Sequence, residues 1–415
     1  MRNIDLVIIG GGPAGMCAAV SAYKAGVKDI LVLERDKNLG GILQQCIHNG
    51  FGLHRFKEEL TGPEYAYKCE AELRGLPIQI QCETTVTEIS KDRIITSISK
   101  DHGVEQIKAG AVIFAMGCRE RPRGALNIAG ARPSGIFSAG TAQKYVNMMG
   151  YMPGKEVVIL GSGDIGLIMA RRMTLEGAKV HAVCEVMPYS GGLERNIQQC
   201  LRDFDIPLML SHTVTEIHGK DRITGVTISK VDKSMQPIEG TEQYIACDTL
   251  LLSVGLIPEN ELSKSAEVKL SGITKGAIVD QDRQTNIEGV FACGNVLHVH
   301  DLADFVSEEA EIAGESAAKF IESGLNKNAD ISIKTDGKVR YTVPQKITDT
   351  SKDVKVFFRV SDVYKNVRLN VRAGGEVLLN QKKKKVAPGE MQTVLIKAEK
   401  LKGFSGELKI TLDQE

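Results

Sequence analysis

The sequence predicts an α/β fold in which two copies of a βαβ-type unit are followed by a small antiparallel β domain. A glycine-rich turn follows an apolar run twice, at residues 10–15 and again at 161–166. The features after each turn recur in the same order, which is typical of a duplicated structural unit. From Ile331 onward, short runs that alternate with period two are separated by turn residues, which indicates antiparallel strands.

The duplication extends well beyond the two glycine turns. Each turn follows a run of four apolar residues expected to form a strand, and a glutamate closes the next apolar run 24 residues after the first glycine. The recurring segments are Leu6–Ile9 and Val157–Leu160, Glu34 and Glu185, Gly40–Gly41 and Gly191–Gly192, and Thr85–Ile89 and Thr213–Ile217. Because the order is the same in both copies, we expect two similar parallel sheets.

The segments after the glycine turns are predicted to be helices. Residues 14–25 and 165–175 are rich in small and apolar residues and contain no proline, which suits a helix packed closely on a sheet. A third helix is expected over 302–321, where Ala and Glu are frequent, and 324–330 is expected to be a polar linker.

Composition excludes several classes of protein. The 415 residues are 42% hydrophobic and 25% charged, with no net charge, which is ordinary for globular proteins and unusual for a dedicated nucleic-acid binder. No apolar run reaches the ~18 residues of a membrane span, and we expect no signal peptide. The nine cysteines are scattered without a CxxC pair, so the sequence predicts no zinc or iron–sulfur site and reduced thiols in the cytoplasm.

The C-terminal part differs in texture and in charge. Short strands are expected at 354–360, 367–371, 376–380, 392–396 and 407–412. Residues 331–415 hold 18 Lys and Arg against 10 Asp and Glu, and Lys382–Lys385 form a continuous run. This run is typical of a solvated edge strand, and the alternative is a surface that docks on an acidic partner.

The glycine turns point to nucleotide binding. A glycine turn between a strand and a helix lets the backbone approach a pyrophosphate, and the helix N-terminus offers free N–H groups with partial positive charge. A glutamate at the end of the next strand can bind a ribose. Two such turns predict two dinucleotides, and Glu185 favours NAD over NADP because a carboxylate repels a 2′-phosphate, although Arg171 and Arg172 lie on the following helix.

Together with Ala115–Arg119 and Thr285–Asn295, these motifs resemble the two-dinucleotide flavoproteins of the pyridine nucleotide–disulfide oxidoreductase superfamily. The resemblance implies a glutathione or thioredoxin reductase-like fold: FAD domain at 1–118 and 256–325, NAD(H) domain at 119–255, and the β domain at 331–415. The implied FAD-binding residues are Gly10, Gly12, Pro13, Ala14, Gly15, Glu34, Arg35, Gly41, Gly117, Gly294 and Asn295. The implied NAD-binding residues are Gly161, Gly163, Asp164, Ile165, Gly166, Glu185 and Gly255. Asn295 stands where the superfamily has Asp.

A narrower resemblance concerns the redox partner. The segments 40–52, 119–124 and 134–143 are similar to the FAD subunits of opine, sarcosine and hydrogen-cyanide-forming dehydrogenases, and to flavoproteins that accompany anaerobic glycerol-3-phosphate dehydrogenases. It implies electron transfer to another dehydrogenase subunit, with any iron–sulfur cluster in that partner; a homo-oligomer is also compatible.

The cysteine positions argue against disulfide reduction. A disulfide reductase needs two thiols near the flavin, but Cys46 has no second cysteine before Cys69, and 138–141 contains none. Cys46 is either a buried core thiol or a reactive one, and His48 two residues on would lower its pKa. His298 and His300 follow Thr285–Asn295, which the resemblance places at the flavin and which is called the flavin segment below. They are candidates for a place beside the flavin, whereas no set of residues has metal-ligand spacing.

These observations predict an FAD-dependent NAD(H) oxidoreductase that passes hydride between nicotinamide and flavin without a dithiol, as the flavin subunit of a larger dehydrogenase for glycerol 3-phosphate or an amine. Two alternatives remain open. One is an independent NADH oxidase or peroxidase that uses Cys46, and the other is a non-catalytic scaffold stabilised by FAD.

Overall fold

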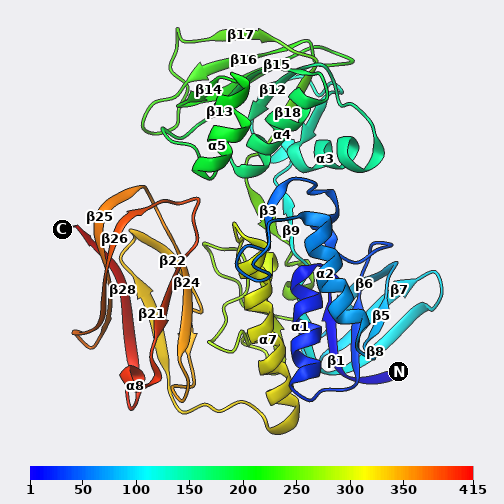
Figure 1. Cartoon of the computed structure of the whole chain (residues 1–415), viewed down its shortest axis with the longest axis vertical. Helices are drawn as coiled ribbons and strands as arrows, with labels where there is room; N and C mark the ends of the chain where they lie inside the picture. The colour runs from blue at the N-terminus through cyan, green and yellow to red at the C-terminus, as the bar shows by residue number, and fades with distance from the viewer. Residues whose placement is uncertain (415) are drawn as a thin grey trace. The chain divides into compact units, whose positions relative to one another are not determined.

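The computed structural model describes residues 1–414 and divides into two compact units (Figure 1). The first unit joins residues 1–118 to the chain from Pro258 onward, and the second is Arg119–Ile257. The chain passes between them at β9 (Cys118–Glu120) and β19 (Leu256–Pro258), which pair as a two-stranded sheet. None of the helices in residues 1–414 is long and apolar enough to span a membrane.

The first unit is built on a seven-stranded sheet with the order β5-β2-β1-β8-β7-β6, and β20 also pairs with β8. Its strands are β1 (Arg2–Ile9), β2 (Ile30–Leu33), β5 (Gln79–Gln81), β6 (Thr84–Ile89), β7 (Ile94–Ser99), β8 (Gly103–Phe114) and β20 (Val290–Ala292). β5, β2, β1, β8 and β20 run parallel to one another, so their carboxyl ends meet at one edge of the sheet.

Three helices cover one face of this sheet: α1 (Pro13–Lys24), α2 (Gly62–Arg74) and α7 (Ala303–Ser323). Leu6 and Ile8 of β1 point into the core beneath them, whereas Val7 and Ile9 point into a second core on the opposite face. Short elements complete this part: β3 (Asn49–Phe51), β4 (Leu60–Thr61) and α6 (Glu261–Ser265). The small residues of α1 let α7 pack closely against it, as Gly314 shows, where a Cβ would lie 2.3 Å from the Ala18 carbonyl oxygen.

The second unit repeats the arrangement with a parallel sheet of order β11-β18-β12-β13-β14 and a four-stranded sheet of order β10-β15-β16-β17. The strands of the parallel sheet are β11 (Ile136–Ser138), β12 (Glu156–Leu160), β13 (Lys179–Glu185), β14 (Leu208–Leu210) and β18 (Thr249–Leu252). The second sheet holds β10 (Ala129–Gly130), β15 (His212–His218), β16 (Gly225–Lys230) and β17 (Gln243–Ala246). The helices are α3 (Ala139–Lys144), α4 (Asp164–Leu175) and α5 (Glu194–Cys200).

The C-terminal part forms two sheets around a separate apolar core. The five-stranded sheet has the order β23-β21-β28-β25-β26 and the three-stranded sheet the order β22-β24-β27. Their bounds are β21 (Ile331–Thr335), β22 (Val339–Val343), β23 (Lys346–Ile347), β24 (Val354–Val360), β25 (Tyr364–Ala373), β26 (Glu376–Val386), β27 (Gln392–Ile396) and β28 (Gly406–Gln414), with α8 (Ala398–Leu401). β26, which carries the lysine run, is an edge strand as predicted.

The predicted fold class is therefore confirmed. The helices expected after the two glycine turns are α1 and α4, and the expected strand at 354–360 is β24. The sequence analysis did not predict β21, β22 and β23, because each is only two to five residues long and turn residues such as Gly337 and Pro344 separate them. The strand predicted at 376–380 ends six residues before β26 does, because the lysine run predicted as an edge strand continues this same strand to Val386.

Candidate dinucleotide sites

The first glycine turn joins β1 to α1 and leaves the start of the helix open. Gly12 is the N-cap residue, makes no side-chain cap, and has no atom within 4 Å of the position that a Cβ would occupy. Gly10 adopts φ +109, where a Cβ would lie 2.4 Å from the Ala115 carbonyl oxygen, and a Cβ on Gly15 would lie 1.8 Å from the Gly10 oxygen. These positions accept only glycine, and the uncapped helix start is suited to an anion.

Glu34 is fixed beside this turn. Its carboxylate, on a residue only 6% exposed, accepts hydrogen bonds from the Gly11 N–H at 2.6 Å and from the Asp36 N–H at 2.7 Å. Gly40 donates its N–H to the Gly11 carbonyl at 2.9 Å, so the chain after β2 folds back on the turn. The Glu34 carboxylate is therefore already oriented to accept a hydrogen bond from a ribose hydroxyl before a nucleotide binds.

Other predicted FAD residues gather around the same turn. Gly41 lies against Gly12, with 3.3 Å between its Cβ position and the Gly12 Cα, and Gly294 lies against Ala14 at 2.9 Å. The open cradle, the uncapped helix and the glutamate fit a dinucleotide such as FAD. Arg35 is exposed and forms an ion pair with Glu259 at 3.9 Å. Individual contacts to FAD stay predictions.

The second glycine turn reproduces the first. Gly163 is the uncapped start of α4, with its nearest neighbour 3.8 Å from the Cβ position. Gly161 adopts φ +102, where a Cβ would lie 2.0 Å from the Ser253 carbonyl oxygen. Glu185 accepts hydrogen bonds from the Ser162 N–H at 2.9 Å, the Ser162 hydroxyl at 2.7 Å and the Met187 N–H at 2.9 Å. The second site therefore also fits a dinucleotide.

Asp164 has a structural task at this second site. Its carboxylate accepts hydrogen bonds from the Leu193 N–H at 2.8 Å and the Asn196 side chain at 2.6 Å, both near the start of α5. These bonds hold the segment after Gly191–Gly192 against the turn. Contacts of Asp164 and Ile165 with a phosphate stay predictions, and Gly255, with φ +104, has nothing within 4 Å of its Cβ position.

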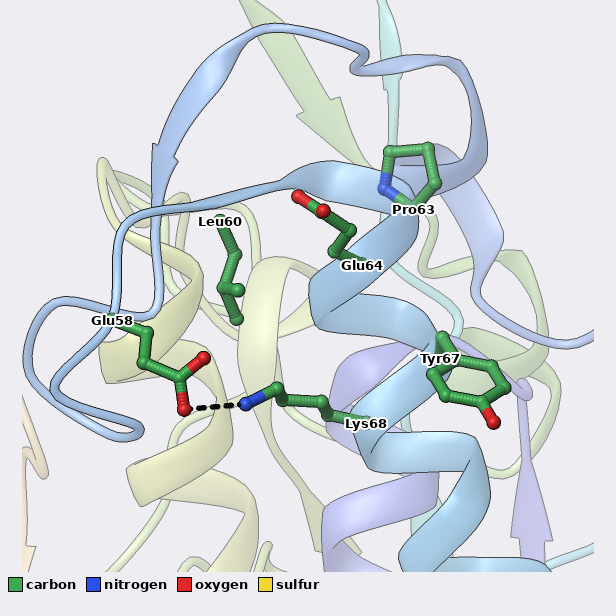
Figure 2. Close-up of a pocket in the computed structure, with 6 residues that line it drawn as sticks. All are labelled: Glu58, Leu60, Pro63, Glu64, Tyr67 and Lys68. Carbon is green, nitrogen blue, oxygen red and sulfur yellow. Dashed lines mark hydrogen bonds and ion pairs between the residues drawn. The ribbon is translucent and has the colours of Figure 1, made fainter.

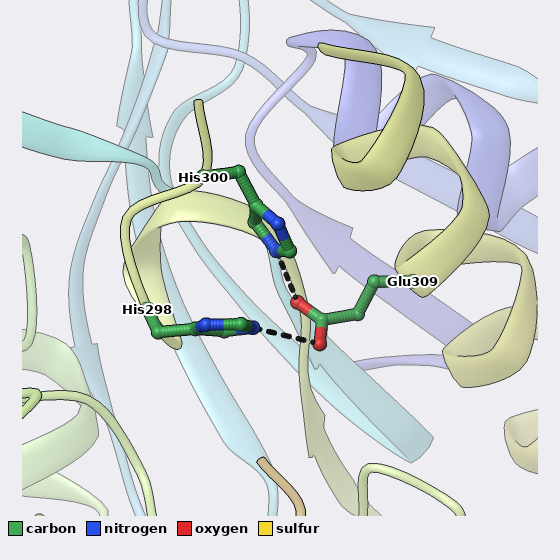
Figure 3. A group of neighbouring side chains, drawn as sticks. All are labelled: His298, His300 and Glu309. Carbon is green, nitrogen blue, oxygen red and sulfur yellow. Dashed lines mark hydrogen bonds and ion pairs between the residues drawn. The ribbon is translucent and has the colours of Figure 1, made fainter. Parts of the chain in front are cut away.

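The flavin segment ends in a buried network centred on Glu309 (Figure 3). One carboxylate oxygen accepts hydrogen bonds from Arg283 Nε and His298 Nε2, both at 3.1 Å, and the other from His300 Nε2 and the Gly294 N–H, both at 3.0 Å. The Arg283, His298, His300 and Glu309 side chains are fully buried. Although burial would raise it, the two histidines hold the pKa of Glu309 well below its usual range, and burial lowers the pKa of His298 to about 4.

The network clarifies three sequence predictions. His298 and His300 with Glu309 lie close enough for a metal site, which residue spacing did not predict; however, four donors already satisfy the carboxylate, and Arg283 adds positive charge. We therefore assign the cluster to structure. Asn295 accepts a hydrogen bond from the His300 N–H at 3.0 Å through its Oδ1. The His298 side chain is fully buried in this network, and its role beside the flavin stays a prediction.

Sequence reasoning missed Glu309 and Arg283. Glu309 lies on the face of α7 that carries Val306, Ala310 and Ala313, and an acidic residue on such an apolar stripe is a usable signal. The packing of His298 against Tyr341 and Phe357, with ring centroids 5.9 Å apart in both cases, carried no sequence signal, because it joins the flavin segment to the β domain.

The surroundings of Cys46 disfavour its thiolate form. Burial raises the pKa of Cys46 to about 12, and its Sγ lies 3.3 Å from the Ile42 carbonyl oxygen. The His48 ring packs on Phe51 at 5.1 Å, and its Nδ1 lies 3.0 Å from the Asn49 carbonyl oxygen. A thiolate is therefore disfavoured at Cys46, and a catalytic role for either residue remains only a prediction.

The segment 138–141, which the family resemblance implies as the other dithiol position, begins a helix. Ser138 is the N-cap of α3, where its hydroxyl accepts a hydrogen bond from the Thr141 N–H at 3.4 Å and lies 2.8 Å from the Thr141 hydroxyl. The structure nevertheless brings one pair of thiols together elsewhere: Cys17 of α1 and Cys69 of α2, whose sulfurs are 3.9 Å apart. Residue spacing could not predict this pair, because 52 residues separate its members.

A shallow hollow of about 440 Å³ lies beside the start of α2 (Figure 2). Its charged groups serve local structure: Lys68 pairs with Glu58 at 2.6 Å, and Glu64 caps α2 through Thr61, a hydrogen bond that lowers the pKa of Glu64. The hollow brings no convergent chemistry, so the glycine turns remain the candidate sites.

Two uncapped glycine turns, each with a carboxylate held by backbone N–H groups, define a protein that binds two dinucleotides. The model of the pyridine nucleotide-disulphide oxidoreductases matches residues 4–317, and the chain belongs to this family. It is an FAD-dependent NAD(P)H oxidoreductase, and members of the family bind both cofactors.

Three relatives illustrate the similarity. An opine oxidase subunit of Agrobacterium tumefaciens is 23% identical over 76% of this chain and 64% of its own length. The hydrogen cyanide synthase subunit HcnB of Pseudomonas protegens is 25% identical over 63% of this chain and 58% of its own. The thioredoxin reductase structure from T. acidophilum is 25% identical, covers 78% of this chain and all of that one, and has a TM-score of 0.65. The chain thus spans less than two thirds of both curated subunits.

Proposed function

We propose that this chain is the flavin- and NAD(H)-binding subunit of a multi-subunit dehydrogenase and works without a redox-active dithiol. The observation that supports it best is the pair of open glycine turns together with the raised pKa of Cys46. Glycerol 3-phosphate, or an amine of the opine type, is the proposed substrate class of the complete enzyme.

The residues of this chain bind and orient the cofactors. The N–H groups at the start of α1 would hold the FAD pyrophosphate, with Glu34 on the ribose, and those at the start of α4 would hold that of NAD(H). Bound FAD supplies the ring that exchanges hydride with nicotinamide. Because Asn295 uses its Oδ1 on the His300 N–H, its amide NH₂ is the group left to donate toward the flavin.

The route of the electrons beyond the flavin follows from the thiols. Ser138 and Thr141 serve as a helix cap, and burial disfavours the Cys46 thiolate, so neither position offers the dithiol of a disulfide reductase. Electrons would then pass from the flavin to another subunit. Two relatives, the opine oxidase and hydrogen cyanide synthase proteins, are themselves named as subunits, which supports this proposal. All nine cysteines are free thiols, so we place the protein in the cytoplasm.

The outer face of the five-stranded C-terminal sheet is the proposed docking surface for an acidic partner protein. Its basic residues alternate with the buried ones: Lys334, Lys346, Arg368, Arg372, Lys382, Lys384 and Lys409. Lys409 lies opposite both Lys334 and Arg372 in the register. Glu407 pairs with Lys409 and Asp413 pairs with Arg372, both at 3.3 Å, but the basic residues of this face outnumber these two carboxylates, and the remaining positive charge would attract an acidic partner.

The central experiment is an anaerobic NADH titration of the flavin-loaded protein, followed by a panel of acceptors. We expect NADH to bleach the flavin absorbance, and oxygen, peroxide, lipoamide and a quinone to restore it slowly. Fast reoxidation by lipoamide would contradict the dithiol-free mechanism. Fast turnover with another simple acceptor would contradict the subunit role, and failure of NADH to bleach the flavin would support a scaffold.

The docking surface is tested with immobilised polyglutamate as an acidic probe. The double variant Lys382→Glu and Lys384→Glu should elute at lower salt than the wild type, whereas Lys100→Glu, an exposed lysine between β7 and β8, serves as the control. Equal elution of all three proteins would exclude this face as the acidic docking surface.

A further inference from the structure

Cys17 and Cys69 form a buried thiol pair between two helices of the first unit. Their sulfurs are 3.9 Å apart, and the residues are 3% and 2% exposed. A disulfide has its sulfurs about 2.05 Å apart, so the two sulfurs must come about 2 Å closer to form the bond. The pair lies on α1, one turn after the glycine turn, and on α2.

The surroundings favour the negative form of Cys17. The hydrogen bond between the two thiols lowers the pKa of Cys17, burial opposes the change, Arg55 and the Ser307 hydroxyl lower the pKa further, and Glu311 raises it. Cys69 has its pKa raised by the same hydrogen bond and by burial, so it keeps its proton. We take Cys17 as the attacking sulfur and Cys69 as the resolving one, and the single-cysteine variants below distinguish this order from the reverse.

Arg55 is itself held in place from two sides. It pairs with Glu72 of α2 at 3.5 Å and with Glu311 of α7 at 2.5 Å, and its Nε is buried without a hydrogen-bond partner. The Ser307 hydroxyl lies 2.7 Å from the Tyr65 hydroxyl, which orients it. The positive charge and the hydroxyl are therefore fixed parts of the fold and not mobile surface groups.

We propose that Cys17 and Cys69 are a modification site at which a hydroperoxide forms an intramolecular disulfide. The Cys17 sulfur attacks the peroxide, the O–O bond breaks, and Cys17 becomes a sulfenic acid. The Cys69 sulfur then attacks the Cys17 sulfur, the S–O bond breaks, and water leaves with the Cys69 proton. Two electrons pass from the thiols to hydrogen peroxide, which is reduced to two molecules of water.

Burial determines the class of oxidant. Residues that are 3% and 2% exposed cannot receive a bulky disulfide such as oxidised glutathione, whereas hydrogen peroxide is close to water in size. The bond would tie α1, which carries the first glycine turn, to α2 and so stiffen the part of the fold that faces the dinucleotide. This proposal does not depend on the identity of the dehydrogenase substrate.

The test treats the folded, flavin-loaded protein with hydrogen peroxide, alkylates the remaining thiols under denaturing conditions, and maps peptides by mass spectrometry. We expect a Cys17–Cys69 linked peptide that has lost two hydrogens, is reversed by dithiothreitol, and raises the Tm by a few degrees. Oxidised glutathione should give none. In Cys69→Ala, Cys17 should gain one oxygen, whereas Cys17→Ala should leave Cys69 reduced.

Two controls keep the result decisive. Cys184→Ala removes a buried thiol of the second unit and should leave the linked peptide unchanged. The same peroxide treatment in urea shows whether the link needs an unfolded chain. The proposal would be overturned if the link formed only in urea, or if oxidised glutathione produced it equally well. It would also be overturned if peroxide oxidised Cys46 while Cys17 and Cys69 stayed reduced and were therefore fully alkylated.

Discussion

The two glycine turns hold the same local geometry on different support. In the first, a Cβ on Gly10 would meet the Ala115 oxygen at 2.4 Å; in the second, a Cβ on Gly161 would meet the Ser253 oxygen at 2.0 Å. Each turn positions a glutamate through backbone N–H groups. The duplication has therefore preserved the backbone cradle, which is the part that any pyrophosphate requires.

The support around each cradle differs. The first turn is backed by Gly294, whose N–H is bound by Glu309 in a network without solvent exposure. The second is backed by Asp164, which holds the start of α5 on a partly exposed surface. We therefore expect the first turn to hold its nucleotide more tightly than the second, as a bound FAD and an exchangeable NAD(H) would require.

The largest expected effects separate the two turns directly. Gly10→Ala places a methyl group against backbone at a strained φ, so we expect purified protein with little bound flavin, a loss of at least about 100-fold in FAD affinity. Gly161→Ala should keep its flavin but need at least about 100-fold more NADH to bleach it. Flavin absorbance per chain and NADH titration measure both.

The controls are glycines at positive φ with open surroundings. Gly26 and Gly177 adopt φ +119 and +87, and nothing lies within 4 Å of either Cβ position. Their alanine variants share the backbone strain but not the clash, and should retain both cofactors. If Gly10→Ala bound flavin as the wild type does, the first turn would not be the FAD site.

Glu309→Gln tests the support that only the first turn has. The amide keeps the shape but removes the charge that faces Arg283, so unfolding free energy should fall by about 3 kcal/mol. Flavin retention should weaken with it, whereas NADH affinity per flavin-loaded chain should hold. Glu308→Gln, on the same helix but paired with Lys355 instead, is the matched control for urea unfolding. Equal losses in both variants would assign the effect to α7 in general.

The same network predicts a pH dependence. His298 faces Glu309, His300 and Arg283, and burial lowers its pKa from 6.5 to about 4. Between these values the unfolded chain binds a proton that the folded chain does not, so stability falls as the pH falls, by roughly 3 kcal/mol in all. Urea unfolding at pH 7, 5.5 and 4.5 measures the slope, and His298→Gln should flatten it. If the unfolding free energy of His298→Gln depended on pH as steeply as that of the wild type, His298 would not be the group that takes up the proton on unfolding.

Glu185→Gln sharpens the comparison at the ribose. The amide oxygen can still accept the hydrogen bonds from Ser162, but the amide NH₂ cannot accept from the Met187 N–H, so the variant loses the charge and one acceptor while keeping the size of the side chain. We expect about tenfold weaker NADH binding, with NADPH binding equal or stronger, in flavin-bleaching titrations. Glu194→Gln on α5 is the control. If the ratio of the two affinities stayed constant, Glu185 would not select the nucleotide.

The fold was predictable where local patterns decide it. Gly10, Gly161 and their following helices form a recurring signal, and β24 and β27 are apolar runs with polar neighbours whose bounds follow from the sequence. β21, β22 and β23 were not predictable, because each has only two to five residues and is stabilised by the sheet in which it pairs more than by its own local pattern.

The site was predictable only in its cradle. Glu34 and Glu185 follow from spacing, whereas the Glu309 network and the Cys17–Cys69 pair join residues that are distant in the chain. His298 stands out in the sequence by its place after the flavin segment, but its partners come from α7 and from the β domain. No local pattern could therefore indicate that the ring is packed and neutral.

The smallest expected effect concerns Cys46, which lies on the loop after Gly41 beside the first turn. Because burial raises the pKa of Cys46 to about 12, almost none is thiolate at neutral pH, and Cys46→Ser should change NADH oxidation with oxygen or peroxide by less than about twofold. Cys82→Ser, a partly exposed thiol whose pKa is also raised by burial, is the matched control. Stopped-flow reoxidation of the reduced flavin measures the rate. A large loss confined to Cys46→Ser would restore the peroxidase alternative, since only a reactive thiol at that position explains it.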